Sequence, residues 1–537
     1  SQDRDVELFS TFGQFTVEDV TAAVQRAPSK QCLLDPVPTH IVKQCIDILA
    51  PVFSDMINKS FSRGLFPSCL KHAVVKPTLK KSTLDIFEPS SYRPVSNLTF
   101  VSKLIERLAM DRLNEHIHSN NLLPVRQSAY RKFHSTETAV TIVVNDIARA
   151  IDSGNVCALV LLDMSAAFDT VDHDILLSTL SDRFGIRGQA MNWLSTYLTG
   201  RSVSVHIGCD VAGPQKLFCG VPQGSVLGPS KFSMYTEEVD CVIGSFKISC
   251  NMYADDIQLL AVMSLNNINS GRSNVEQCVS AVRDWCSARR LTLNPDKTEL
   301  IWFGSRHNLV ALQNHVTDLN IDGVTVSSND SVRDLGVYLD SRINMHVHIN
   351  KLVSVCFYHL RRLRQLRRIL PSDMRQRLAS ALILSRIDYC NSVLAGLPAS
   401  TLAPLKRVMN ATVRFVANLK PRDHITPAMK QLHWLPLEQR ITYKLCLLMH
   451  SVVNDCAPSY LTDCVTPVSS LPNRAHLRSA ASGLYNVPRV RSSVGARAFS
   501  VAAPLAWNKI PQDIRQLSSR ITFKKHLKTF LFNCAYN

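Results

Sequence analysis

The first 70 residues alternate apolar and polar positions with a helical period. Residues 16–27 (TVEDVTAAVQRA) and 39–64 each place an apolar stripe along one side, which predicts two amphipathic helices. Thr16 and Thr39 are predicted to cap these helices at their N-termini, and Gly64 is predicted to end the second. Two further amphipathic helices are predicted over residues 101–117 and 136–151.

Extended segments follow and interleave with these helices. Residues 71–100 hold short pieces broken by prolines, with lysines between them, and this predicts a small basic β-rich unit. Residues 155–162 (NVCALVLL) predict a buried strand that stops at Asp163. A third segment, residues 291–303 (LTLNPDKTELIWF), has turn residues at its centre and predicts a hairpin.

Two adjacent acids interrupt the apolar pattern in NMYADDIQLLAV, residues 251–262. The flanking runs 246–253 and 257–263 predict the arms of a β-hairpin, with Asp255 and Asp256 at its turn. Like charges held this close repel each other, so such a turn is either solvated or holds a cation. On this segment alone the solvated acidic turn is the simpler interpretation.

Composition narrows the class of protein. At 537 residues the chain is long enough for several domains. No apolar run approaches the ~18 to 20 residues of a membrane helix, and residues 1–30 lack a signal-peptide pattern, so we expect an intracellular protein without membrane partners. The 16 cysteines include no C-x-x-C pair, which favours reduced thiols over a zinc site or a disulfide framework. The chain begins at Ser1 and not at methionine, so we expect a piece of something longer.

Charge is distributed unevenly along the chain. The formal net charge is +17, but residues 1–340 sum to −5 and residues 341–537 to +22. Clustered Lys and Arg gain binding free energy by releasing counterions from phosphates. This asymmetry predicts a polyanionic partner for the C-terminal part.

Two acids far apart in the chain suggest a metal site. Asp163 ends a predicted strand, and Asp255 lies in a predicted turn 92 residues later. If both belong to one sheet, they form a two-carboxylate platform. Mg²⁺ prefers one or two carboxylates plus substrate phosphate oxygens, and a pair of such ions ~3.5 to 4 Å apart supports phosphoryl transfer. Asp256 would then be a supporting acid.

The order of these motifs resembles a known family. ALVLLDMSAAFDTVDH, CGVPQGSVLGP, YADD and LNPDKTELIWFG resemble the successive palm motifs of reverse transcriptases from non-LTR retrotransposons of the jockey and chicken-repeat kind. KHAVVKPTLKKS, SSYRPVSNL and QSAYRKFHSTETAV resemble the fingers motifs of the same enzymes, and DLGVYLDSRINMHVHI resembles the region after the palm. Ordered motifs over nearly the whole chain are far more specific than YADD alone.

The resemblance implies an α+β right-hand polymerase. Its parts would be a helical N-terminal extension (1–60), fingers (61–160), a palm with an antiparallel sheet (161–340), a helical thumb (341–420), and a mostly helical basic C-terminal region of unknown role (421–537). The implied activity is RNA-directed DNA polymerisation with two Mg²⁺ ions, or Mn²⁺ in their place, as nucleotidyl transfer to a primer 3′-OH. The implied partners are dNTPs, an RNA template and a DNA primer or target, in the nucleus after a cytoplasmic ribonucleoprotein stage.

The same resemblance assigns roles to particular residues. Asp163, Asp255 and Asp256 would be the metal ligands. Phe168 would be the aromatic gate that rejects a sugar 2′-hydroxyl, with an ordinary core aromatic as its alternative. The remaining nucleotide-binding candidates are Arg93 and either Lys80 or Lys81 for the triphosphate, and Gln223 and Gly224 in the loop that approaches template and nucleotide. Lys297 would be a general acid near pyrophosphate, with a solvated turn lysine as its alternative.

A basic helix is predicted in FYHLRRLRQLRRIL, residues 357–370. Its apolar seam consists of Leu360, Leu363, Leu366 and Leu370, and its basic face of Arg361, Arg362, Arg364, Arg367 and Arg368. Membrane-surface helices share this pattern, but its place after the palm favours a grip on the primer–template duplex. Arg131 is a further candidate for nucleic-acid contact.

Two features depart from the family pattern. Lys231 interrupts the apolar stretch after the GVPQGSVLGP loop, and a buried lysine must find a partner or reach solvent. No segment is expected to supply the endonuclease that relatives carry. Two other functions therefore compete with an active reverse transcriptase: a decayed or co-opted nucleic-acid-binding protein, and an RNA-dependent RNA polymerase, which Phe168 disfavours.

Overall fold

The computed structural model describes residues 6–30, 32–165, 168–321, 323–471 and 483–536. The chain divides into two compact units, and each is built from separate stretches of sequence. The first unit comprises residues 1–130, 163–242 and 281–294, and the second comprises residues 131–162, 243–280 and 295–537. Among the described helices, none is long and apolar enough to cross a membrane.

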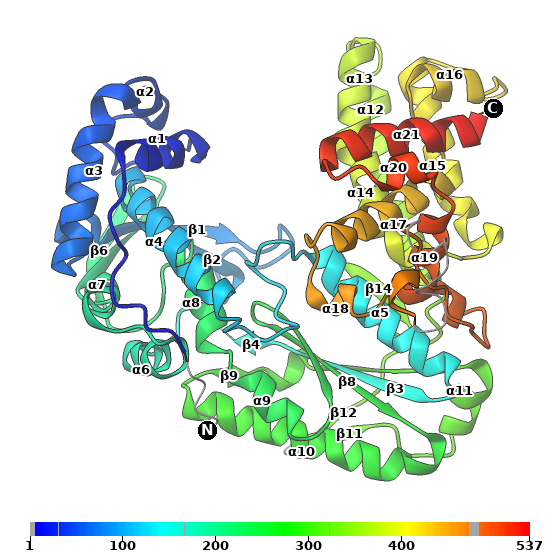
Figure 1. Cartoon of the computed structure of the whole chain (residues 1–537), viewed down its shortest axis with the longest axis horizontal. Helices are drawn as coiled ribbons and strands as arrows, with labels where there is room; N and C mark the ends of the chain where they lie inside the picture. The colour runs from blue at the N-terminus through cyan, green and yellow to red at the C-terminus, as the bar shows by residue number, and fades with distance from the viewer. Residues whose placement is uncertain (1–5, 31, 166–167, 322, 472–482, 537) are drawn as a thin grey trace. The chain divides into compact units, whose positions relative to one another are not determined.

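The first unit combines helices with a mixed four-stranded sheet of order β2-β1-β5-β6 (Figure 1). Its strands are β1 (His72–Leu79), β2 (Tyr92–Asn97), β5 (Arg201–Ile207) and β6 (Asp210–Leu217). β1 is antiparallel to β2 and parallel to β5. Its helices are α1 (Val17–Arg26), α2 (Thr39–Gln44), α3 (Ile46–Arg63), α4 (Phe100–Ser119), α6 (His173–Phe184), α7 (Gly188–Leu198) and α8 (Leu227–Tyr235).

Helix ends in the first unit follow local sequence rules, with one exception. Thr16 caps α1 as predicted and forms a capping box with Asp19, and Gly64 ends α3 with φ +65°. The prediction for Thr39 was wrong, because the N-cap position is Pro38 and the Thr39 hydroxyl donates to the Lys30 carbonyl at 2.8 Å. The single helix predicted over 39–64 is two helices, α2 and α3.

The second unit contains an antiparallel sheet of order β10-β3-β8-β7. Its strands are β3 (Val156–Leu162), β7 (Ser249–Tyr253), β8 (Asp256–Met263) and β10 (Glu299–Phe303). The buried strand predicted before Asp163 is therefore confirmed as β3, and the acidic hairpin is confirmed as β7 and β8. β3 pairs with both β8 and β10, so it lies in the middle of the sheet.

The hairpin predicted over residues 291–303 was wrong. β9 (Thr292–Leu293) pairs with β4 (Met164–Ser165), whereas β10 pairs with β3. A short 3₁₀ turn over Pro295–Lys297 separates β9 from β10. Two short apolar runs around a turn suit a hairpin locally, but each run finds a better partner elsewhere in the chain.

Helices make up the rest of the second unit. They are α5 (Thr136–Asp152), α11 (Arg306–Leu312), α12 (His346–Gln365), α13 (Ser372–Ala379), α14 (Ser385–Asp388), α15 (Ala399–Ala417), α16 (Thr426–Gln431), α17 (Leu437–Val453), α18 (Ser459–Thr462), α19 (Phe499–Asn508), α20 (Gln512–Arg515) and α21 (Arg520–Tyr536). α9 (Val239–Gly244) and α10 (Ile268–Ala288) run across the division into units. Two small hairpins, β11 (Leu319–Ile321) with β12 (Val324–Val326) and β13 (Ser331–Asp334) with β14 (Val337–Asp340), complete the strands.

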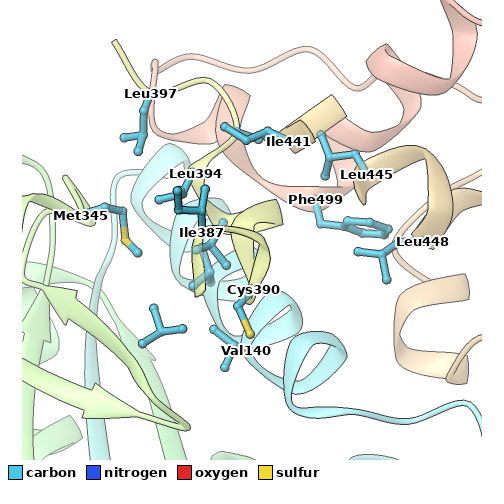
Figure 2. Packing of buried hydrophobic residues seen from close by; sticks show 14 of the residues in the cluster. Val140, Met345, Ile387, Cys390, Leu394, Leu397, Ile441, Leu445, Leu448 and Phe499 are labelled. Atoms are coloured by element: carbon cyan, nitrogen blue, oxygen red, sulfur yellow. The ribbon is translucent and has the colours of Figure 1, made fainter. Parts of the chain in front are cut away.

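The C-terminal helices share one hydrophobic core with α5. Val140 of α5 lies near Ile387 and Cys390, while Leu445 of α17 and Phe499 of α19 continue the same cluster (Figure 2). The Lys444 ammonium donates to Glu137 at 2.9 Å, and the Tyr460 hydroxyl donates to Thr138 at 2.9 Å. The C-terminal region is therefore packed on α5 and is not an appended tail.

Candidate nucleotide and nucleic-acid site

Asp163 lies where β3 gives way to β4. It is half-buried, and its backbone carbonyl accepts a hydrogen bond from the Asn294 amide at 2.9 Å. The next two residues pair with Leu293 and Thr292 of β9. The backbone at Asp163 is thus fixed by a strand that follows it by about 130 residues in the chain.

Phe168 is half-buried against the Gly/Pro-rich loop of residues 220–229. Its ring lies 4.8 Å from the Phe232 ring, between centroids, and its carbonyl accepts from the Val221 amide at 2.8 Å. Gly220, with φ +83°, packs against the backbone of Asp169, where a Cβ would approach the Asp169 carbonyl oxygen to 2.8 Å. Backbone contacts therefore hold the Phe168 segment on this loop.

The same loop is also attached to β2. The Ser96 amide donates to the Gln223 carbonyl at 2.7 Å, and Gly224, with φ +117°, leaves only 2.6 Å between a built Cβ and the Ser96 carbonyl oxygen. Any side chain at position 224 would push the loop away from Ser96 of β2. The Gln223 amide donates to the Asp169 carboxylate at 3.0 Å, which orients both side chains.

Asp169 is a residue that the sequence reasoning did not single out. Burial raises the pKa of its carboxyl, while the hydrogen bond from Gln223 and the charge of Lys80 lower it. Its position directly after Phe168 in the AAFD motif was the signal that could have found it.

Lys80 and Arg93 lie at one end of the β1–β2 pair. Arg93 is opposite Thr78, and the Lys80 amide donates to the Ser91 carbonyl at 2.9 Å. The Lys80 ammonium donates to the Ser90 carbonyl at 2.9 Å, and Lys80, Lys81 and Arg93 are all exposed. The loop that holds Gln223 is hydrogen-bonded to β2. Gln223 and Lys80 therefore both act on the Asp169 carboxylate, Gln223 by a hydrogen bond and Lys80 through its charge, which lowers the pKa.

Asp255 and Asp256 lie where β7 turns into β8. Ala254 occupies the left-handed region at φ +58°, and Asp256 is paired with Tyr253 as the first residue of β8. Asp255 is half-buried and Asp256 is exposed. The register of β8 with β3 runs from Met263 to Ile257, which pairs with Leu162.

A buried acid supports this turn from the β13–β14 hairpin. Asp334 is 2% exposed, and the Gln258 amide of β8 donates to its carboxylate at 2.5 Å. Burial, and secondarily the charge of Asp256, raise the pKa of Asp334 to about 7. Sequence reasoning missed this residue, because nothing in DLGVYLD marks its first aspartate, Asp334, as buried.

Lys297 and Arg131 remain candidates on weaker grounds. Lys297 is exposed at the end of the turn between β9 and β10. Arg131 is half-buried, and burial lowers the pKa of its guanidinium. Among the residues that the structure describes, no group of three or more His, Cys, Asp or Glu side chains is arranged as a metal site. The assignment of metal ligands therefore stays a prediction.

Lys231 is buried in α8. It is 1% exposed, its ammonium lies 3.7 Å from the centre of the Tyr197 ring, and it has no hydrogen-bond partner. Burial lowers its pKa, the charge of Glu106 opposes that change, and the charge of Arg201 adds to it. Glu106 is itself buried and accepts from the amides of Val226 and Leu227 at the start of α8. Burial of the Lys231 ammonium is therefore unfavourable, and the cation–π contact with Tyr197 offsets its cost only in part.

The basic helix differs from its prediction at one end. α12 ends at Gln365, so Leu366 and Leu370 do not continue the apolar seam, and Leu366 is 49% exposed. Leu360 and Leu363 are buried as predicted. Four of the five arginines are exposed, and Arg367 is half-buried.

A basic groove, which the sequence did not predict, lies between α12 and α15. Arg364 and Arg367 line it from the end of α12 and the residues that follow, and Arg407 and Arg414 line it from α15. Its volume is about 460 Å³, and its lining residues include no acid. Convergent cations without a carboxylate are typical of a phosphate-binding surface.

Comparisons with known proteins indicate a family for part of the chain. Residues 78–339 match the family described as reverse transcriptase (RNA-dependent DNA polymerase). The chain is 30% identical over 360 residues to the probable RNA-directed DNA polymerase from transposon BS of Drosophila melanogaster. The aligned part is 65% of this chain and 38% of that protein.

Two further relatives show the same relationship. The RNA-directed DNA polymerase from mobile element jockey of Drosophila funebris is 25% identical over 63% of this chain and 36% of its own length. The probable polymerase from transposon X-element of Drosophila melanogaster is 25% identical over 61% of this chain and 35% of its own length. The matched part is thus little more than a third of these relatives. Residues 78–339 of this chain are thus similar to the reverse transcriptase family, and the relatives named here are RNA-directed DNA polymerases of transposons and mobile elements.

Proposed function

We propose that this chain is an RNA-directed DNA polymerase that adds dNTPs to a primer 3′-OH on an RNA template. The observation that carries this proposal is the β3–β8 register, in which Leu162 pairs with Ile257. Asp163 follows Leu162 directly, and Asp255 and Asp256 directly precede Ile257. Consecutive Cα atoms are about 3.8 Å apart, so chain connectivity favours convergence of these acids.

Their donor set suits divalent ions of the Mg²⁺ type. Aspartate supplies hard oxygen ligands, and a polymerase substrate supplies the remaining phosphate oxygens. In this proposal Asp163 and Asp255 hold two Mg²⁺ ions, and Asp256 supports them. When bound, the ions would stabilise the negative charge on the attacking and leaving oxygens of an in-line phosphoryl transfer.

The chain's own residues would bind and select the nucleotide. Arg93 and Lys80 would contact the triphosphate, because both are cations at one end of the β1–β2 pair. Phe168 would exclude a 2′-hydroxyl with its ring, which packs on Phe232 of α8 while Val221 holds its backbone. The contact between Gln223 and Asp169 would keep that loop in position beside β2.

The polymer would be held by the second unit. Arg364 and Arg407 line the basic groove and would contact the phosphates of the primer–template duplex. In the implied right-hand layout, the β10-β3-β8-β7 sheet is the palm, β1 and β2 belong to the fingers, and α12 to α15 form the thumb.

The test is primer extension on a primed RNA template with dNTPs or with NTPs. The proposal expects extension with dNTPs that requires a divalent ion, and little with NTPs. Equal use of NTPs would favour an RNA-dependent RNA polymerase. Binding of primed template without any extension would favour a decayed or co-opted binding protein.

A further inference from the structure

A second pocket lies among the helices of the second unit, outside the candidate site and the basic groove. Its volume is about 470 Å³. Residues of η5 (Ser380–Leu384), α14, η6 (Asn391–Leu394), α17, α21 and the segment between α16 and α17 line it. Among them are Asp388, Asn391, Trp434, Tyr443 and Lys528. Ile387 and Cys390, the chain neighbours of Asp388 and Asn391, are packed in the core near Ile441 and Leu445 of α17 (Figure 2).

Asn391 is the residue that requires explanation. It is 1% exposed, and neither its amide nitrogen nor its amide oxygen has a hydrogen-bond partner. A buried polar group without a partner costs free energy, and most are paired in native proteins. An unpaired amide that lines a cavity therefore indicates a ligand that both accepts and donates hydrogen bonds.

Asp388 adds an acceptor beside this amide. One of its carboxylate oxygens accepts from Arg440 at 2.7 Å, and the other is buried without a partner. Arg440 also donates to the Leu435 carbonyl at 2.9 Å, so the pair is held in place. Arg440 offsets the charge of Asp388, and the unpartnered carboxylate oxygen favours a ligand that has an N–H donor.

The backbone around these residues is irregular. Ser380–Leu384 form a π-helical turn, and Ser380 and Leu384 both line the pocket. Cys390, directly before Asn391, is in the left-handed region at φ +50°. π-Helical turns and left-handed residues other than glycine occur often at functional sites.

The surface next to the pocket is basic. α21 buries Phe523, Leu527 and Leu531. Its exposed residues include Arg520, Lys524, Lys525 and Lys528. Lys528 lines the pocket, and Trp434 and Leu435 contribute apolar wall. Asp388 and Asn391 line the pocket together with Arg440 and Lys444, and the exposed α21 lysines lie next to it. Hydrogen-bonding groups beside cations suit a base and its adjoining phosphates.

We propose that this pocket binds one unstacked nucleobase of single-stranded RNA. Asn391 and Asp388 would contact the donor and acceptor groups on the edge of the base, and the α21 lysines would contact the adjoining phosphates. A base in a duplex cannot enter such a pocket, which restricts the ligand to single strands. The proposal rests on the proposed function only for the choice of RNA as ligand.

The experiment measures binding of the full chain to labelled single-stranded RNA by fluorescence anisotropy. An abasic riboside replaces each nucleotide in turn. We expect at least one abasic position to weaken binding about tenfold, as the loss of a well-bonded base would. Asn391→Leu should bind intact RNA about tenfold more weakly and show no abasic penalty. Duplex RNA of the same sequence should bind both proteins equally.

Two variants serve as controls for folding and for charge. Asn314→Leu makes the same replacement at an exposed asparagine outside the pocket, and it should behave as the unmodified chain. Lys528→Gln alters only an exposed side chain, so it should fold, bind more weakly and keep the abasic penalty. An unmodified chain that tolerates every abasic position, or an Asn391→Leu chain that keeps the penalty, would overturn the proposal.

The outcome also separates this inference from the polymerase assignment. Asp255→Asn should lose primer extension and retain the abasic penalty. If the unmodified chain extends no primer but shows the penalty, the proposed function fails and the base pocket stands. If it extends primers but shows no penalty, the pocket assignment fails alone.

Discussion

Leu162 of β3 and Ile257 of β8 form the end pair of an antiparallel register that runs back to Val156 and Met263. β3 is flanked on its other edge by β10, and both Leu162 and Ile257 are buried. A central, buried strand resists slippage, because a shift by one residue would turn every apolar side chain to the other face. The strand pairing next to Asp163 and Asp255 in the sequence is therefore strongly specified.

The first prediction concerns Phe168. We expect Phe168→Val to admit ribonucleotides and to lower the dNTP-over-NTP preference about tenfold or more, because the smaller side chain leaves room for a 2′-hydroxyl. Single-nucleotide incorporation kinetics measure this ratio. Phe168→Tyr keeps the ring and should keep the preference. Unchanged sugar selectivity in the valine variant would remove the gate role.

Lys231 gives a prediction about stability. Its pKa is lowered from 10.5 in the folded state, so below pH 10.5 the unfolded chain binds more protons at this site. Stability should then rise with pH toward 10.5, and the destabilising contribution is greatest at lower pH. We expect Lys231→Met to be more stable at pH 7 by about 1 kcal/mol.

Urea unfolding at pH 7 and pH 9 measures this difference. The gain from Lys231→Met should be smaller at pH 9 than at pH 7. Lys59→Met is a control, because Lys59 is an exposed lysine in an ion pair with Asp55. A variant less stable than the unmodified chain at both pH values would show that Lys231 stabilises the fold through Glu106 and Tyr197.

Asp334 gives the opposite dependence on pH. Its pKa is raised from 3.8 to about 7, so ionisation costs the folded state free energy as pH rises through this interval. We expect Asp334→Asn to match the unmodified chain near pH 4 and to exceed its stability at pH 8, by up to about 4 kcal/mol. Unfolding free energies measured with EDTA present would show this. A constant difference at both pH values would contradict the assignment.

The basic groove predicts a change in salt dependence. Each phosphate contact removed should reduce the slope of log K against log salt by about 1. Arg364→Gln with Arg407→Gln should therefore reduce the slope for a primer–template duplex by about 2. The double variant Arg377→Gln with Lys406→Gln loses the same charge, from cations paired with Asp373 and Glu438, and serves as the control. Equal slopes in the two double variants would place the duplex on another surface.

Local patterns predicted the central elements of the fold. The apolar run before Asp163 and the hairpin around Asp255 are confirmed as β3, β7 and β8, because strong periodicity and turn residues specify them locally. The predicted division of the chain into fingers, palm and thumb stays a prediction.

Non-local pairing explains what sequence reasoning missed. The 291–303 segment has the local pattern of a hairpin because its two strands are adjacent in the chain, yet they pair with β4 and β3. Asp334 and Asn391 sit in ordinary loop-like sequence, and only packing of distant segments buries them. The packing of the C-terminal region on α5 was equally hard to predict, because its contacts with Glu137 and Thr138 span more than 300 residues.

The central claim is that Asp163 and Asp255 act together on divalent ions, and primer extension tests it most directly. The measurement is Mg²⁺-dependent dNTP incorporation on a primed RNA template by the unmodified chain, by Asp255→Asn and by Asp318→Asn, a control at another aspartate of the second unit. We predict that Asp255→Asn loses incorporation by at least about a thousandfold while still binding primed template, and that Asp318→Asn retains it. Incorporation by Asp255→Asn at the unmodified rate would contradict the account.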